Sequence, residues 1–271
     1  MRLYPALLAF ALLPPAASAA GAAPAIEAEF ATIDFNHLPA ADAPQAQGRA
    51  VVTPELLSRI DQAYLNRHVG ANLEDSNTTL RALLADQPRS PDLLWRLARG
   101  LHAAGSRESD RDAKLKTYQE GETLLTTALS LRSDDAVIHY WLGRTYGAQN
   151  VIKRTLGLAK AMRRELEAAI RIDPSLAGAH HYLGVLLHEL PGIVGGSDRK
   201  AVAELEAAVR LAPNEASVYP ALAEAYRGVK DKPRAIETAR KTFAIKASDD
   251  PGGYDESVKA AREVLQKLGS N

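Results

Sequence analysis

The glycine-rich stretch at residues 191–200, PGIVGGSDRK, has the residue types of a loop that could bind a phosphate. Glycines let the backbone approach an anion closely, and the N-terminus of a following helix attracts negative charge. The spacing fits neither the GxxxxGK(S/T) nor the GxGxxG pattern, and Asp198 brings an acid to the place of the anion. We therefore interpret the stretch as a connection between two helices. Pro191 would end the first helix, the glycines permit positive φ, and Ser197 or Asp198 would cap the second helix.

Three histidines that lie close in the sequence, His180, His181 and His188, could be metal ligands. His181 and His188 share a helical face, but two turns separate their Cα atoms by about 10.5 Å, which is too far for easy joint ligation. No carboxylate stands at ligand spacing, and His188-Glu189 is not part of an HExxH motif. The sequence therefore predicts structural histidines and no metal site.

Motifs of known catalytic sites do not occur in the sequence. There is no GxSxG elbow and no P-loop, and the chain has no cysteine that could be a nucleophile, a metal ligand or half of a disulfide. Two carboxylate pairs, Asp134-Asp135 and Asp249-Asp250, fall at predicted turns, where aspartate serves as a helix N-cap. We predict a protein that is not an enzyme and that has no cofactor.

Composition narrows the class of protein further. The chain has 33 basic and 33 acidic residues, and this balance argues against nucleic-acid binding through bulk electrostatics. Alanine dominates and aromatic residues make up only 6% of the chain, which favours helices over sheets.

The first twenty residues have the pattern of a secretory signal peptide. Arg2 gives a positive start, residues 3–13 an apolar core that is too short for a permanent transmembrane helix, and Ala17-Ser18-Ala19 an AxA-like cleavage site. We expect residues 1–20 to be removed and residues 21–52 to be a flexible lead-in rich in Ala and Pro. Residues 53–271 would then form one domain, periplasmic or secreted, with no integral membrane segment.

One pattern recurs four times along the chain. A large residue is followed by Leu and a small residue, and then by another large residue, which is typical of a helix that packs closely through its small position. The small residues of the four segments are Ala98, Gly143, Gly184 and Ala223. The large residues that open them are Leu94, His139, His180 and Tyr219.

A second amphipathic segment follows each of these, so that the chain is organised as helical hairpins. Pro174 and Pro213 stand where one hairpin ends and the next begins. A degenerate hairpin precedes them, with helices expected at residues 56–64 and 73–84. Polar insertions are expected between the two helices of three hairpins, at residues 105–116, 150–157 and in the glycine-rich stretch. Residues 255–268, with Asp255 as N-cap, are predicted to form a C-terminal capping helix.

These segments resemble the tetratricopeptide repeat (TPR) family, whose pattern is WxxLGxxY followed by A, F, A and P. The resemblance spans about residues 54–268 and implies an all-α fold: a right-handed solenoid of four to five helical hairpins with a C-terminal capping helix. The segments LLWRLAR at 93–99, YQEG at 118–121 and HYWLG at 139–143 are similar to a subgroup related to the regulator of microtubule dynamics proteins. The glycine-glycine insertion is similar to the periplasmic T component of TRAP transporters. That likeness implies a soluble partner of a substrate-binding protein with a ligand pore, although this chain lacks the cysteine that would anchor it to lipid.

The first helices of a hairpin solenoid line its concave face, which is the usual binding surface. The positions beside the packing stripe carry mainly aromatic and cationic side chains: Trp95, Arg99, His102, Tyr140, Arg144, His181, His188, Glu224 and Arg227. Arginine forks suit carboxylates, and aromatic rings give rigid contact area. The set predicts a groove for a peptide segment or a C-terminal carboxylate. The alternative interpretation is that Arg99 and Arg144 pair with nearby acids of the same chain.

Two functions follow from these observations. The first is a non-enzymatic exported scaffold that binds a partner protein or an extended peptide segment in its concave groove. The second is a small-ligand-binding accessory protein for a periplasmic transport system. An open groove would favour a peptide, whereas a closed pore or pocket would favour a small ligand. If the protein is a scaffold, we expect Arg144→Glu to weaken partner binding with little loss of thermal stability. The sequence carries no signal for the oligomeric state.

Overall fold

The described part of the chain consists of helices and short connections. The computed structural model describes residues 51–269, and no strand occurs within that range. The predicted signal peptide and residues 21–50 of the predicted lead-in lie outside it. The first six helices are α1 (Pro54–Leu65), α2 (Asn72–Asp86), α3 (Pro91–Arg107), α4 (Arg111–Leu131), α5 (Ala136–Lys153) and α6 (Leu156–Ile172). The remaining ones are α7 (Ala177–Glu189), α8 (Asp198–Leu211), α9 (Val218–Gly228), α10 (Lys232–Lys241) and α11 (Tyr254–Lys267). Short 3₁₀ turns are η3 (Gly192–Val194), η4 (Thr242–Ala244) and η5 (Pro251–Gly253).

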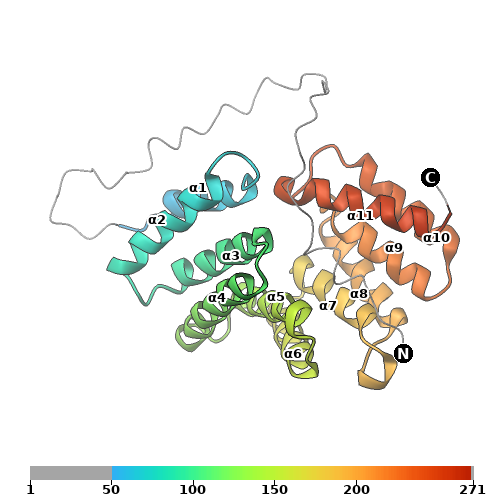
Figure 1. Cartoon of the computed structure of the whole chain (residues 1–271), viewed down its shortest axis with the longest axis horizontal. Coiled ribbons are helices and arrows are strands. Elements are labelled where there is room, and N and C mark those ends of the chain that lie inside the picture. Colours follow the sequence, from blue (N-terminus) through green and yellow to red (C-terminus); the bar gives the residue numbers. More distant parts are fainter. Residues whose placement is uncertain (1–50, 270–271) are drawn as a thin grey trace.

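Successive helices pair as hairpins, α1 with α2 through α9 with α10, and α11 packs on the last of them. The first helices α3, α5, α7 and α9 also contact the next first helix in the row, so they form one continuous inner layer. Figure 1 shows the hairpins following one another around an arc whose ends, α1 and α11, face each other. The predicted all-α solenoid of helical hairpins with a final helix is confirmed.

Close packing at the small positions holds the hairpins together. A Cβ added at Gly143 would lie 2.9 Å from Leu166 Cγ, and one added at Gly184 would lie 2.6 Å from Leu205 Cγ. Leu166 and Leu205 are fully buried. In both hairpins, a leucine of the second helix therefore packs directly against the glycine of the first helix. The small residue of the repeat pattern therefore does what the sequence predicts.

In three of the four repeats, the large residue that opens the repeat contacts a carbonyl oxygen of the turn before its helix. His139 and His180 direct Nδ1 at Glu165 and Glu204, at 2.7 Å in both cases. Their Nε2 atoms reach the carbonyl oxygen six residues earlier, at 3.0 and 3.1 Å. Tyr219 donates its hydroxyl to the equivalent carbonyl at 2.7 Å. Side chains of different chemistry thus make the same connection in three successive repeats, which is a structural role for His180.

Helix caps agree with the sequence at some aspartates and not at others. Asp135 accepts hydrogen bonds from the backbone N–H groups of Val137 and Ile138, as a cap should. Asp250 was expected to cap as well, but its carboxylate pairs with Arg67. Asp255 is not an N-cap either, because η5 runs directly into α11 and Gly253 takes the cap position.

The expected insertions have two different outcomes. The polar residues at 105–116 and 150–157 mostly extend α3, α4, α5 and α6, because helix-forming residues continue there. The glycine-rich stretch remains a connection, in which Gly195 has φ +95°. Ser197, rather than Asp198, caps α8 by accepting from the backbone N–H of Lys200.

Membrane insertion of the described helices is not indicated. None of the helices between residues 51 and 269 is both long and apolar enough to cross a bilayer.

Candidate functional site

Five of the predicted groove residues meet on the inner layer. Arg99 and His102 come from α3, Tyr140 and Arg144 from α5, and His181 from α7. Three further rings, which are not among the predicted groove residues, complete this central cluster: Tyr64, Trp141 and Tyr182. The rings form one chain, in which Tyr140 lies 5.2 Å from Trp141 and 6.0 Å from Tyr182 between centroids. Tyr64 and His102 also contact Trp141, at 6.0 and 5.8 Å.

Arg144 lies in the middle of the central cluster. Its guanidinium carbon is 4.4 Å from the ring centre of Tyr182 and 4.5 Å from that of Trp141. One Nη donates a long hydrogen bond of 3.4 Å to the hydroxyl of Tyr140, whereas the buried Nε has no partner. No carboxylate of residues 51–269 forms an ion pair with Arg144. Burial acts to lower the pKa of Arg144, but the tyrosines around it raise the pKa above its ordinary value.

Arg99 has a different environment, although the repeat pattern treats the two arginines alike. Its Nη2 donates to Asp61 at 2.6 Å, and its guanidinium lies 4.2 Å from the ring centre of Tyr64. Only 8% of Arg99 is exposed, and this burial lowers its pKa. Trp95 stacks between Arg99 and Arg96, which shares the same aspartate. Pairing with a local acid therefore holds for Arg99 and not for Arg144.

The two histidines of the central cluster are neutral at physiological pH. Burial, and then the charge of Arg144, lowers the pKa of His181 to about 3. The same two causes, followed by Arg67, hold the pKa of His102 well below its usual range. His102 Nδ1 is buried without a hydrogen-bond partner. No group of three potential ligands is placed for a metal ion within the described residues.

Three other predicted groove residues, His188, Glu224 and Arg227, lie towards the C-terminal end. His188 directs Nδ1 at Asp198, the first residue of α8, at 2.6 Å. Glu224 accepts from Arg227 at 2.5 Å and from Lys267 of α11 at 2.8 Å. These side chains satisfy one another, so the predicted groove divides into a central aromatic part and a charged part that joins α7, α8, α9 and α11.

Some of the missed residues stand beside predicted ones. Trp141 and Tyr182 each follow a selected residue by one position, so the recurring HYW and HHY triplets were an available signal. Tyr64 and Asp61 belong to α1, whose repeat pattern is too degenerate to give a register.

An ion pair joins the two ends of the solenoid. Arg67, in the turn after α1, donates from both Nη atoms to the two carboxylate oxygens of Asp250, at 2.5 and 2.7 Å. Arg67 and Asp250 are 183 positions apart, which is the longest sequence separation among the hydrogen-bonded side-chain pairs of the described range. α1 also contacts η5 directly. The inner layer is therefore bounded by a continuous run of chain.

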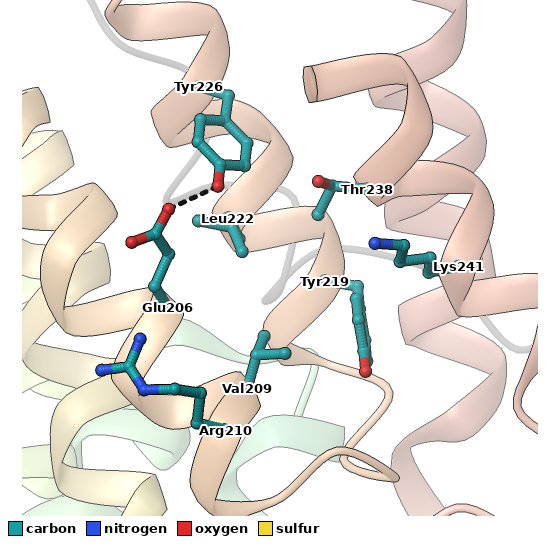
Figure 2. Close-up of a pocket in the computed structure, with 8 residues that line it drawn as sticks. All are labelled: Glu206, Val209, Arg210, Tyr219, Leu222, Tyr226, Thr238 and Lys241. Carbon is teal, nitrogen blue, oxygen red and sulfur yellow. Dashed lines mark hydrogen bonds between the residues drawn. The ribbon is translucent and has the colours of Figure 1, made fainter. Parts of the chain in front are cut away.

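A separate hollow of about 220 Å³ lies between α8, α9 and α10. Figure 2 shows Tyr226 at one side of it, donating its hydroxyl to Glu206 at 2.6 Å, with Tyr219 and Lys241 at the other side. Burial, followed by this bond, raises the pKa of Tyr226 to about 12. None of the predicted groove residues lines this hollow.

The repeat residues and the fold agree with one family. Residues 56–191 match the family model described as regulator of microtubule dynamics protein 1-3. The chain belongs to this family. The match covers α1 to α7 and so includes the whole central cluster, whereas α8 to α11 follow it. No curated protein sequence matches the chain.

Solved structures that are similar to this chain include a TPR protein. The thermophilic TPR protein TTC0263 of Thermus thermophilus is 20% identical, covers 77% of this chain and 99% of its own, and superposes with a TM-score of 0.57. The pilF protein of Pseudomonas aeruginosa is 18% identical, with 79% of this chain and 90% of its own covered and a TM-score of 0.49. At this level of identity the first likeness shows the TPR fold.

Proposed function

We propose that this protein is a non-enzymatic, exported scaffold that binds an extended segment of a partner protein on the inner layer of its solenoid. The observation that supports it is the continuity of the central cluster over α3, α5 and α7. An extended segment that follows the inner layer meets an aromatic ring or a cation in each of three successive repeats. Repeat solenoids bind in this way, through contacts distributed over several units.

Photo-cross-linking tests the location of the partner. A photoreactive amino acid in place of Trp95, which is half-buried on the inner layer, should yield a defined adduct with a segment of one protein. The same amino acid in place of Ile172, exposed at the end of α6, is the matched control and should not. A synthetic peptide of the cross-linked segment must then bind the purified chain. Equal adducts at both positions, or a peptide that does not bind, would place the partner elsewhere.

The Arg144→Glu substitution expected from the sequence would not separate partner binding from stability. The substitution would put a carboxylate among the rings of Tyr140, Trp141 and Tyr182, and an unpaired charge in such a place destabilises the fold. Arg144→Gln removes the charge and keeps a planar donor, so we expect it to separate binding from stability better.

Export is part of the proposal and has its own test. Residues 1–20, joined to a reporter enzyme that is active only after export, should give activity, whereas a reporter without them should give none. Activity that does not depend on these residues would contradict export through this segment.

A second candidate is a small-ligand-binding accessory protein for transport, and the Arg67–Asp250 pair favours it. Because the two ends of the solenoid are in contact, the chain encloses the inner layer, as it would enclose a binding site for a small molecule. Native mass spectrometry of the chain purified from its own cells distinguishes the two candidates. A bound small molecule of constant mass would favour the second candidate, and a chain without one would favour the peptide.

A further inference from the structure

Arg144 is distinguished from its neighbouring arginines by the lack of an acid. Arg67 holds Asp250 with two hydrogen bonds, and Arg99 holds Asp61 with one. Arg144 has three aromatic rings and one long hydrogen bond to a neutral phenol. A guanidinium removed from water without a counter-charge is costly, and proteins accept that cost where a ligand supplies the charge.

Arg144 is largely enclosed by protein but keeps some contact with solvent. Protein atoms surround the side chain on its inner side, and Nε is fully enclosed, yet the residue keeps solvent-accessible surface. Arg144 is therefore largely removed from water but is not sealed off from solvent. With Nε enclosed, a ligand would engage the two Nη groups, whose N–H bonds form a planar fork.

Charge and shape together define the chemical class of the ligand. Asp250 neutralises Arg67, Asp61 is shared by Arg99 and Arg96, and His102 and His181 are neutral. Arg144 is therefore the guanidinium of the central cluster that no carboxylate of residues 51–269 contacts. One charge suits a carboxylate monoanion better than a phosphate dianion. The rings of Tyr140, Trp141 and Tyr182 around the guanidinium suit a flat or apolar body behind that carboxylate.

We propose that Arg144 binds the carboxylate of an aromatic or apolar monoanion, with the partly exposed rings of Tyr140 and Tyr182 packed against its body. The proposal rests on the proposed function only in placing the ligand on the inner layer. A free organic acid and the C-terminus of a peptide both carry this chemistry, and the experiment separates these sources.

Tryptophan fluorescence of the full chain provides the test. The chain has two tryptophans, Trp95 and Trp141, and both lie at or beside the central cluster. Benzoate should change the emission in a saturable way, and its neutral isostere benzamide should bind about tenfold more weakly or worse, because it lacks the charge. A tripeptide ending in phenylalanine is then compared with its C-terminal amide. Preference for the free peptide acid over benzoate identifies a chain end as the source, and the reverse identifies a free acid.

Variants decide whether Arg144 is the binding group. Arg144→Gln should weaken benzoate at least about tenfold and remove the preference over benzamide. Arg144→Lys keeps the charge without the planar fork and should retain a weaker preference for benzoate over benzamide. It replaces Arg144→Gln as the test variant if circular dichroism shows that Arg144→Gln is unfolded. Arg171→Gln, at an exposed arginine near the end of α6, is the control and should bind benzoate as the parent does.

Three results would overturn the proposal: equal titration of benzoate and benzamide, unchanged benzoate binding in folded Arg144→Gln, or tighter binding of inorganic phosphate than of benzoate. Each of these is independent of the cross-linking experiment. A partner can be captured by a chain that ignores benzoate, and benzoate can bind where no partner segment is found.

Discussion

At the scale of single residues, the central cluster places an arginine that stays charged beside two histidines that burial keeps neutral. Arg144 stays charged, and the same burial that makes its charge costly keeps His102 and His181 neutral. The imidazoles act as polar rings beside a cation. This arrangement ties folding to pH, because unfolding would return both histidines to water.

The pH dependence has a defined sign. The pKa of His181 falls from an ordinary value of about 6.5 in the unfolded chain to about 3 in the folded one. The unfolded state therefore binds more protons below pH 6.5. The contribution to stability is fully present above that pH and is lost progressively as the pH falls towards 3.

We expect His181→Asn to reduce this loss. The free energy of unfolding of the parent, measured with urea from pH 7 to pH 4, should fall by up to about 1.4 kcal/mol per pH unit more steeply than that of the variant. His68→Asn is the control, because exposed His68 meets nearly the same solvent in both states. Parallel pH profiles for the parent and His181→Asn would show that His181 is not the group responsible.

At the scale of helices, the glycines at the small positions set how closely the two helices of a hairpin approach. Ala98 and Ala223 occupy the same position in other repeats, so a methyl group is tolerated there in principle. At Gly184 the added Cβ would meet Leu205 Cγ at 2.6 Å and the carbonyl oxygen of Ala201 at 3.1 Å. That contact cannot be relieved by turning the end of a flexible side chain, because a backbone atom takes part in it.

We therefore expect Gly184→Ala to destabilise the protein. Overpacking costs about 1–3 kcal/mol, and the better helix propensity of alanine returns about 1 kcal/mol, so the net loss should be up to about 2 kcal/mol. Gly157→Ala is the matched control, since nothing lies within 4 Å of its added Cβ in the first turn of α6. It should leave stability unchanged or raise it by up to about 1 kcal/mol. A stabilised Gly184→Ala chain in thermal and urea unfolding would mean that α7 and α8 can move apart freely.

The sequence predicts elements of this kind well, because their determinants are local. The spacing of Gly143 and Gly184 gives the hairpins, and a polar residue before an apolar run gives caps such as Asp135. The residues of the central cluster could be predicted from the sequence only in part. Asp61 and Tyr64 are brought to Arg99 by the packing of α1 against α3, and no pattern within either helix records that register.

At the scale of the whole molecule, the contact between the ends depends on residues that no repeat pattern connects. Arg67 and Asp250 lie in turns, and Gly252 allows the close approach, since a Cβ added there would lie 2.7 Å from an Nη of Arg67. The residues next to Asp250 in the sequence predict a helix cap, and they carry no sign of its contact with Arg67. The contact is a consequence of the curvature summed over all hairpins.

The Arg67–Asp250 pair should hold the ends of the solenoid together. The side chains are 13% and 30% exposed, so the pair is partly desolvated, and breaking it leaves a half-buried guanidinium without a carboxylate. We expect Asp250→Asn to lower the free energy of unfolding by about 1–3 kcal/mol and to increase the radius of gyration in small-angle scattering as the ends separate. Asp249→Asn, at the exposed neighbour, removes the same formal charge and should change neither quantity. If both variants scatter alike, the shape is set by the hairpin interfaces alone and the ion pair only follows it. If the radius of gyration increases only in Asp250→Asn, the contact between the ends of the solenoid depends on one ion pair. Benzoate binding to that variant would then show whether the site at Arg144 needs the two ends to be in contact.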